Sequence, residues 1–248
     1  MEKEQLGQHF LINKKVLKTI VEFSELNKND VVLEIGAGNG VLTRELAEKV
    51  KKVAAIELDD DFKEDLDNLD DNVQVIIGDA LGKIDMITFN KIVANIPYVI
   101  TEPLFRRLLK LEFDLCVLLI GENFYNLLNE NGKWGVISKI FFDVEKILDV
   151  KKEDFNPKPR TNSVLIRVKK RNKKLNENEM IVKEFSLQDD KKVRNALIYA
   201  LIRVKNLTKK KAKELLSNLD IKDLEEENTG SLSNEDFMKI LGKINNFG

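Results

Sequence analysis

The stretch Asn95-Ile96-Pro97-Tyr98 joins an amide, a proline and an aromatic ring directly after an apolar run at 92–94. The apolar run is typical of the end of a buried strand. The proline removes a ladder donor and restricts Ile96 to extended geometry. The amide and carbonyl groups of this turn are therefore held stiffly beside an aromatic face. Such a set suits the binding of a flat ring that carries an NH2 group, although an ordinary strand exit with a buried tyrosine would look the same.

A glycine turn, Gly36-Ala37-Gly38-Asn39-Gly40, separates a β-branched stretch at 30–35 from a helical pattern at 41–50. Strand, glycine turn and helix in this order bring backbone N–H groups close to a ligand. A dinucleotide fingerprint would have its third glycine where Val41 stands. The tighter spacing favours an amino-acid moiety and a ribose over a pyrophosphate, with a plain glycine turn as the alternative. Glu34, in front of the turn, fits recognition of an amino group or orientation of the loop.

Three acidic or amide residues fall at the ends of successive predicted strands: Glu57, Asp79 and Asn95. In an open α/β sheet, ligands bind at the carboxyl edge where such residues meet. Glu57 follows the glycine turn by about twenty residues, where a carboxylate accepts the two ribose hydroxyls of a nucleoside. Asp79 follows the strand at 73–77 and fits either the exocyclic amine of an adenine or the cap of the next segment.

The elements that must position these residues indicate a globular α/β protein. The chain has 248 residues, of which 43% are hydrophobic, so we expect one medium domain and a small second one. A strand at 163–168 is followed by the polar run 169–174 and then only by helical periodicities. The domain boundary is placed near Lys170, which gives domains at 1–170 and 171–248.

Composition limits the partners and the compartment. The net charge is −1, so a polyanion must be met by a local basic patch. No run of 18 apolar residues and no secretory pattern are present, which predicts a cytoplasmic protein without a membrane span. His9 is the only histidine and Cys116 the only cysteine, and Cys116 is expected in a buried strand. We therefore expect no metal site, and we expect a monomer because no pattern indicates an obligate interface.

The sequence resembles the ribosomal RNA adenine dimethyltransferase family, to which the erythromycin-resistance methylases are related. The resemblance covers nearly the whole chain. Its most specific feature is the tetrapeptide at 95–98 together with a later Phe-x-Pro-x-Pro. The motifs that carry it are Gly7-Gln8-His9-Phe10-Leu11, the segment 34–40, Glu57, Gly78-Asp79-Ala80, Asn95-Ile96-Pro97-Tyr98 and Phe155-Asn156-Pro157-Lys158-Pro159, with weaker matches at 192–197 and 232–237.

The resemblance implies a Rossmann-like methyltransferase core that uses S-adenosylmethionine, followed by a small all-helical C-terminal domain. It implies that the methyl donor is bound by Gln8, His9, Leu11, Gly36, Gly38, Glu57, Asp79 and Asn95. From spacing alone, His9 would more simply be a surface or packing residue. The expected catalytic residues are Asn95, Ile96, Pro97, Tyr98 and Phe155.

The expected chemistry follows from the groups themselves. The sulfonium of the donor makes its methyl group electrophilic, whereas the lone pair of an adenine amine is delocalised into the ring. Hydrogen bonds from this amine to the Asn95 amide oxygen and the Ile96 carbonyl would favour a pyramidal nitrogen. Tyr98 would stack on the extruded base, and Phe155 would close the pocket on another side. Alignment of the two reactants then dominates the rate.

Local basic residues are the candidates for contact with the RNA backbone. Arg106 and Arg107 follow the tetrapeptide closely, and Lys158 and Arg160 lie in and after the Phe-x-Pro-x-Pro segment. These four residues are predicted to contact phosphates. The segment at 121–125 departs from the Gln-Lys-Glu run that is usual for the family, which removes expected RNA contacts but no donor contacts.

Three functions fit these patterns. The favoured one is dimethylation of adenines in small-subunit ribosomal RNA, with ribosomal RNA or the small subunit as partner. The second is methylation of adenine in large-subunit RNA, which Ile96, the short length and the stretch at 157–163 favour. The third is an assembly or transcription factor that has kept the fold and binds RNA without catalysis. Methyl transfer to isolated subunits separates the three.

Overall fold

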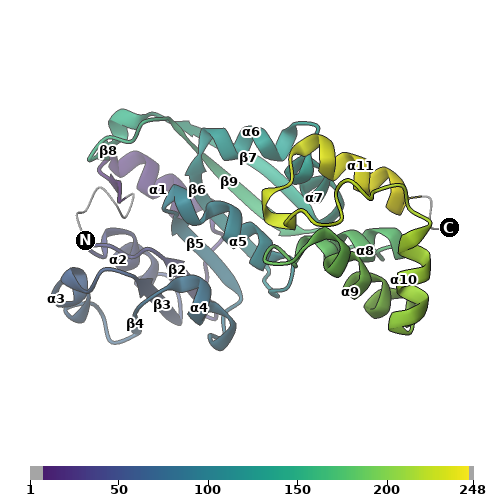
Figure 1. Cartoon of the computed structure of the whole chain (residues 1–248). Coiled ribbons are helices and arrows are strands. Elements are labelled where there is room, and N and C mark those ends of the chain that lie inside the picture. The colour runs from purple at the N-terminus through teal and green to yellow at the C-terminus, as the bar shows by residue number, and fades with distance from the viewer. Residues whose placement is uncertain (1–7, 246–248) are drawn as a thin grey trace. The chain divides into compact units, whose positions relative to one another are not determined.

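The computed structural model describes residues 8–245, so Gly7 of the first motif lies outside the described residues. The chain divides into two compact units. The first comprises Met1–Asn126 and Phe142–Lys170, and the second comprises Leu127–Phe141 and Arg171–Gly248. In Figure 1 the strands of the first unit run in purple to teal, and helices α8 to α11 of the second run in green to yellow.

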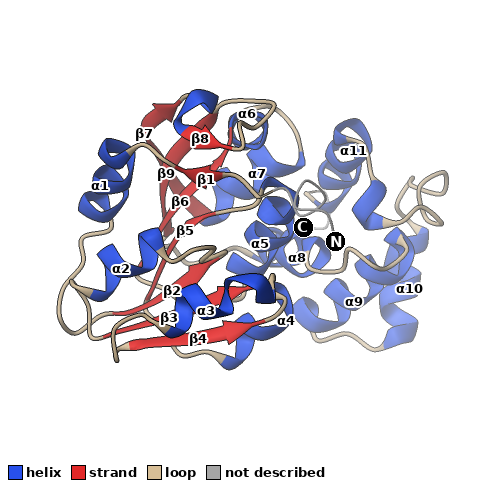
Figure 2. Cartoon of the chain, turned by 90° about the vertical axis from the view of Figure 1, so that its left-hand side faces the viewer, coloured by secondary structure: helices blue, strands red, loops and turns tan. Residues whose placement is uncertain are grey.

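The first unit is built on a seven-stranded sheet with the order β4-β3-β2-β5-β6-β9-β7, flanked by helices (Figure 2). The strands from β4 to β6 are parallel, and β9 is antiparallel to both of its neighbours. This arrangement confirms the predicted Rossmann-like α/β class. The strands are β2 (Val31–Ile35), β3 (Lys52–Glu57), β4 (Val73–Ile77), β5 (Lys91–Asn95), β6 (Leu115–Gly121), β7 (Phe142–Val150) and β9 (Ser163–Lys170).

The helices that accompany this sheet are short. Helix α1 buries Val16, Leu17, Ile20 and Val21 on one face, at the three- and four-residue spacing of an amphipathic helix. Its first turn is capped by the Asn13 side chain, which accepts from two backbone N–H groups. The helices are α1 (Lys14–Phe23), α2 (Val41–Ala47), α3 (Lys63–Asp67), α4 (Ala80–Lys83), α5 (Thr101–Leu108) and α6 (Glu122–Asn129), which continues past Asn126.

The centre of the sheet explains where a ligand can lie. Every residue of β6 is buried, including Cys116, as expected for a parallel strand covered on both faces. Strand β2 lies between β3 and β5. Strands β3 and β4 are added on one side of β2 and β5 and β6 on the other, so the order of the strands reverses at this point. Such a switch point opens a crevice at the carboxyl ends of the strands.

A two-stranded ribbon brings the start of the chain to this crevice. Strand β1 (Phe10–Leu11) pairs antiparallel with β8 (Phe155–Asn156). The backbone N–H of Ile12 donates to the Asp154 carbonyl at 2.8 Å, and the Asn13 side chain donates to the Asp154 carboxylate at 2.8 Å. The sequence did not predict this ribbon, because two-residue strands carry no periodicity.

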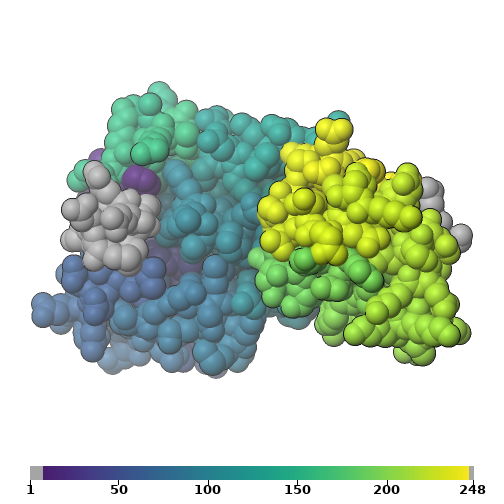
Figure 3. All heavy atoms as spheres, in the orientation of Figure 1, coloured from purple at the N-terminus to yellow at the C-terminus, as the bar shows by residue number. Residues whose placement is uncertain are grey.

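The second unit is helical in its described part, as predicted for the C-terminal region. Phe185 of α8 and Phe237 of α11 pack with ring centroids 6.2 Å apart, and α11 (yellow) lies directly against α8 (green) in Figures 1 and 3. The helices are α7 (Lys133–Phe141), α8 (Glu177–Ser186), α9 (Val193–Lys205), α10 (Lys209–Ser217) and α11 (Asn234–Ile244). Strand β9 ends at Lys170, where the domain boundary was predicted, but residues 127–141 belong to the second compact unit. The division into domains at 1–170 and 171–248 stays a prediction.

Candidate active site

The glycine turn after β2 adopts backbone conformations that side chains rarely allow. Gly36, Gly38 and Gly40 have φ of 76°, 53° and 76°. A Cβ on Gly36 would lie 3.3 Å from Cδ of Pro97, and one on Gly38 would lie 2.9 Å from Cε1 of Phe10. The turn therefore needs glycine for both its left-handed φ and its close contacts. Together these features form a backbone cradle in front of α2.

Glu57, the last residue of β3, fixes this cradle from the neighbouring strand. Its carboxylate accepts from the Gly38 N–H at 2.7 Å and from the Asp59 N–H at 2.9 Å, and its side chain is buried. Each carboxylate oxygen has two lone pairs, so both oxygens retain an acceptor site for a hydroxyl. The predicted ribose contact is compatible with this geometry and stays a prediction.

Asp79 follows β4 and caps the next helix. Its Oδ1 accepts from the Leu81 N–H at 3.0 Å, which makes it the N-cap of α4. Asp79 also lines a cavity at the carboxyl ends of the strands, which is described below together with its other lining residues. The capping alternative for Asp79 is therefore observed, while the contact with an adenine amine stays a prediction.

Asn95 is the last residue of β5, and its amide is oriented by the start of the chain. The Nδ2 group donates to the His9 backbone carbonyl at 2.9 Å. No hydrogen bond within residues 8–245 uses the Asn95 Oδ1. Donation through Nδ2 therefore leaves the amide oxygen as the available acceptor at the cavity.

The Tyr98 ring is fixed at both its hydroxyl and its face. The hydroxyl lies 2.5 Å from Oγ of Ser163, a fully buried residue at the start of β9. A Cβ on Gly121 would lie 3.3 Å from Cγ of Tyr98, so the ring packs directly on that glycine. Burial raises the pKa of Tyr98, opposed by the hydrogen bond to Ser163. No sequence pattern indicated Ser163 or Gly121 as supports of Tyr98, because both lie far from it in the chain.

His9 connects the ribbon to the tetrapeptide. Its Nδ1 hydrogen-bonds the Pro157 carbonyl at 2.9 Å, which makes Nδ1 the donor. Its ring centroid lies 5.8 Å from that of Tyr98. His9 is therefore a residue of the site, and its place there came from the family resemblance because spacing alone favoured a packing role.

One cavity brings the predicted residues together. All eight predicted donor-binding residues line it, and so do Ile96, Pro97 and Tyr98. Their individual roles stay predictions. Glu34 of β2 also lines this cavity.

The structure differs from the prediction at Phe155. This residue is 3% exposed, belongs to the main hydrophobic core and does not line the cavity. It pairs with Leu11 in the ribbon, and Leu11 is the member of the pair that reaches the cavity. Burial of a large aromatic ring in the core is favourable, which explains why the side chain turns inward. Phe155 thus packs behind the site and does not close it.

Three of the four predicted phosphate contacts are engaged by acidic side chains. Arg106 pairs with Glu102 at 3.0 Å, and its side chain is only 12% exposed. Burial lowers the pKa of Arg106, opposed by Glu102. Arg107 pairs with Asp85 at 2.8 Å, Lys158 pairs with Glu153, and Arg160 is exposed.

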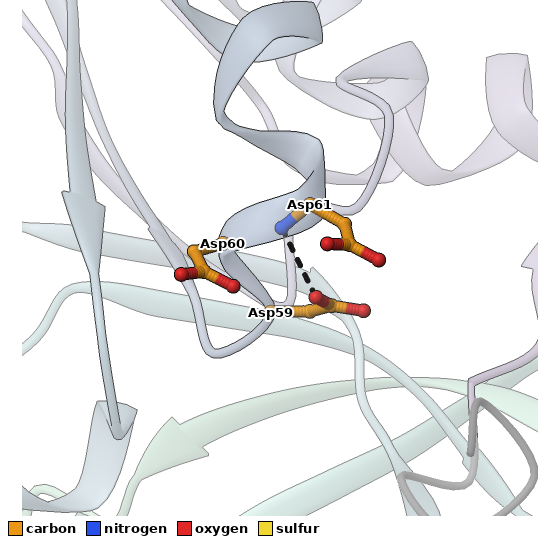
Figure 4. A group of neighbouring side chains, drawn as sticks. All are labelled: Asp59, Asp60 and Asp61. Carbon is orange, nitrogen blue, oxygen red and sulfur yellow. Dashed lines mark hydrogen bonds between the residues drawn. The ribbon is translucent and has the colours of Figure 1, made fainter. Parts of the chain in front are cut away.

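The described residues contain one group of acidic side chains close enough to share a cation, Asp59, Asp60 and Asp61 (Figure 4). The Asp59 Oδ1 accepts from the Asp61 N–H at 3.1 Å, and its Oδ2 accepts from the Gln8 amide at 3.2 Å. These bonds give Asp59 a local role as the cap of a short 3₁₀ turn. Asp60 and Asp61 are exposed, as acidic residues at a helix start usually are.

A buried carboxyl completes the site. Glu34 of β2 is 1% exposed and lines the cavity, and its Oε2 has no hydrogen-bond partner in the described chain. An orphaned acceptor beside a glycine cradle fits a ligand with a positively charged amino-acid part and a ribose. S-adenosylmethionine has both features. The residues present therefore fit the methyl donor that the resemblance implies.

Glycine turn, polar strand ends and sheet order together define a Rossmann-like methyltransferase. The model of the ribosomal RNA adenine dimethylase family matches residues 1–236. The chain belongs to this family. Its members use S-adenosylmethionine, so the predicted class of enzyme and its cofactor are confirmed.

Named relatives and solved structures agree with the family. A probable ribosomal RNA small subunit methyltransferase A from Pyrococcus abyssi is 35% identical over 87% of this chain and 83% of its own length. A protein of the same name from Methanococcus vannielii is 33% identical, covering 98% and 99%. A dimethyladenosine transferase from Plasmodium falciparum has a TM-score of 0.64 at 26% identity, covering 96% and 98%. The 23S rRNA methyltransferase ErmE, at 20% identity, a TM-score of 0.59 and coverage of 95% and 99%, shares the fold.

The helices described between residues 8 and 245 include none that is long and apolar enough to cross a membrane.

Proposed function

We propose that this chain dimethylates N6 of adenines in small-subunit ribosomal RNA. The names of its relatives support this substrate. The observation that carries the proposal is the orientation of Asn95, whose Nδ2 is engaged by the His9 carbonyl while its Oδ1 is available at the cavity. An amide oxygen in this position accepts a hydrogen bond from an NH2 group.

Groups of the chain itself compensate for the weak nucleophilicity of the adenine amine. S-adenosylmethionine supplies a methyl group that is already electrophilic. Asn95 Oδ1 and the Ile96 carbonyl accept hydrogen bonds from the adenine amine and hold its nitrogen pyramidal, with the lone pair aimed at the methyl group. The Ile96 N–H donates to the Leu119 carbonyl at 3.1 Å, which anchors this part of the turn to β6. Precise alignment of this kind accounts for most of the rate.

Tyr98 provides the platform for the extruded base. Because its hydroxyl is engaged by Ser163 and its ring packs on Gly121, the ring keeps one orientation. A fixed aromatic face stacks on a base at little cost in entropy, which is how enzymes hold flipped bases. The stack places the amine beside Asn95.

Phosphate contacts come from the exposed basic residues. Arg107 and Lys158 exchange their acidic partners for RNA phosphates, and exposed Arg160 joins them. Exposed ion pairs stabilise a protein by about 0–1 kcal/mol, so this exchange costs little. The Arg106 side chain is mostly buried against Glu102 and supports α5 instead.

The proposed transfer needs neither a metal nor a second chain. The donor is an electrophile by itself, and the alkylated amine loses its proton readily. We also propose a monomer that acts on the small ribosomal subunit in the cytoplasm. Full activity in EDTA and the monomer mass in light scattering are the expected results.

Radiolabelled methyl transfer tests the substrate directly. Small and large ribosomal subunits are purified from cells that lack the modification and incubated with the enzyme and labelled donor. Label in small-subunit adenines supports the proposal. Label in large subunits identifies the enzyme as a large-subunit methylase, and no label in either subunit identifies an RNA-binding factor.

A further inference from the structure

Two carboxyl groups of neighbouring strands line the donor cavity, and they differ in the hydrogen bonds that they accept. Glu57 is 5% exposed and accepts from two backbone N–H groups. Glu34 is 1% exposed, and its Oε2 has no hydrogen-bond partner among the described residues. The Thr43 hydroxyl of α2 is fully buried and has none either. Glu34 is thus the carboxyl group whose negative charge the protein leaves without compensation.

The surroundings of Glu34 disfavour its charged form. Burial raises the pKa of Glu34 to about 8, and the charge of Glu57 on β3 adds to this increase. The other titratable side chains that line the cavity are His9 of the ribbon, Asp79 after β4 and Tyr98 after β5. No lysine or arginine is among the lining residues described. A proton is therefore the available counter-charge at neutral pH.

The proposed ligand of this cavity is positively charged, and no lining side chain gives Glu34 such a counter-charge. S-adenosylmethionine carries a sulfonium and an α-ammonium group, each with one positive charge. An opposite charge within about 4–6 Å favours the ionised form of a carboxyl group. A cation that enters the cavity therefore takes over the role of the proton.

We propose that Glu34 couples donor binding to proton release: it is protonated in the free protein and ionises when the cationic methyl donor binds. The carboxyl O–H bond breaks, its electron pair stays on the carboxylate, and the proton passes to the buffer. This inference rests on the proposed donor site and adds a proton to its binding equilibrium. Below the pKa of the free protein, the affinity for the donor is expected to fall by up to tenfold per pH unit.

Calorimetry of the full chain measures this proton directly. S-adenosylmethionine is titrated at pH 7.0 in phosphate and in Tris, two buffers of different ionisation enthalpy. The difference in binding enthalpy gives the net number of protons released. The wild type is compared with Glu34→Gln, which has no carboxyl proton to release at this position. We expect the wild type to release close to one proton more than Glu34→Gln.

Thr43→Val is the matched variant, because it keeps the carboxyl group and the shape of the neighbouring side chain. It leaves the Glu34 carboxyl group in place, so proton release close to that of the wild type is expected. Thr43→Val also covers the case in which Glu34→Gln does not fold, because loss of proton release in Thr43→Val would overturn the proposal. Equal proton release by wild type and Glu34→Gln, or no release by the wild type, would overturn it too.

S-adenosylhomocysteine identifies the group that faces Glu34. This product lacks the sulfonium but retains the α-ammonium. Proton release with both ligands supports the proposal and assigns the contact to the ammonium, whereas release with the donor alone supports it and assigns the contact to the sulfonium. Binding of the donor without release overturns this inference alone. Failure of the wild type to bind the donor overturns the proposed donor site as well.

Discussion

The two sides of the donor cavity are fixed by different kinds of contact. On the glycine side, the N–H groups of Gly36 and Ala37 donate to the Ile56 carbonyl of the adjacent strand, and Gly38 donates to Glu57. On the amine side, Asn95 is oriented by His9, which is 86 residues away in the chain, and Tyr98 by Ser163, which is 65 residues away. The first side is thus set by neighbouring strand ends, and the second depends on the complete fold.

This difference separates two functions. The backbone hydrogen bonds of the glycine side need only the pairing of β2 with β3. The amine side requires the ribbon and β9 to be in place before Asn95 and Tyr98 point correctly. Damage to the glycine side is expected to weaken donor binding, and damage to the amine side is expected to slow transfer.

The largest effect is expected from Asn95→Ala. Loss of the amide removes an acceptor that positions the nucleophile, and removal of one positioned polar group costs about 100- to 1000-fold in rate. Single-turnover transfer to small subunits should fall by about this factor, while calorimetry should show donor affinity within a few-fold of wild type. Asn68→Ala, which removes an exposed amide, is the control. Normal transfer by Asn95→Ala would contradict the mechanism.

Gly38→Ala is expected to disturb the glycine side of the donor cavity. At φ 53°, with a Cβ 2.9 Å from Phe10, an alanine costs roughly 1–2 kcal/mol. Donor affinity measured by calorimetry should therefore fall by about fivefold to thirtyfold. Gly242→Ala is the matched control, because a Cβ there meets nothing within 4 Å and a helical alanine adds about 0.5–1 kcal/mol of stability. Equal donor affinity in Gly38→Ala and wild type would show that the cradle does not hold the donor.

His9→Phe and His9→Asn sharpen the comparison at the ribbon. Phenylalanine keeps a ring beside Tyr98 but cannot donate to the Pro157 carbonyl, and this lost hydrogen bond is worth about 0.5–1.5 kcal/mol. The expected result is a kcat reduced by about 3- to 10-fold. Asparagine has an N–H donor at the same position as Nδ1 and should recover most of kcat. If His9→Phe and His9→Asn had the same kcat, the hydrogen bond to the Pro157 carbonyl would not orient the site.

The smallest effect is expected from Tyr98→Phe. The ring remains on Gly121, but the hydrogen bond to Ser163 is lost, at about 1 kcal/mol. The KM for RNA should rise by a few-fold with donor affinity unchanged. A double-mutant cycle with Ser163→Ala measures the coupling, and additive effects of the two changes would show that the hydroxyl pair does not hold the ring.

The parts of the site that the sequence predicted are those with local signals. The strand expected at 30–35 is observed at Val31–Ile35, and the helix expected from Val41 begins there. Periodicity and glycine spacing suffice for these elements because their hydrogen bonds run between chain neighbours or adjacent parallel strands. Gly36, Gly38, Glu57, Asp79 and Asn95 accordingly line one cavity, whereas Gln8, His9 and Leu11 were expected there only from the family resemblance.

The rest depends on contacts that no local pattern records. The ribbon pairs Leu11 with Phe155 across more than 140 residues, and this pairing turns Phe155 into the core. The acidic partners of Arg107 and Lys158 are likewise set by the folded surface. Sequence motifs indicated which residues matter, whereas the direction of each side chain required the three-dimensional structure.

The bond between His9 and Pro157 also has a consequence for synthesis of the protein. A ribosome makes residue 9 long before residue 157, so the acceptor for the histidine ring does not exist while the first strands are being translated. An emerging chain can pair β2 with β3 and assemble the glycine cradle at that stage. The hydrogen bond that holds the His9 ring forms only after the Pro157 carbonyl has left the exit tunnel, so the amine side of the site is completed later than the glycine cradle.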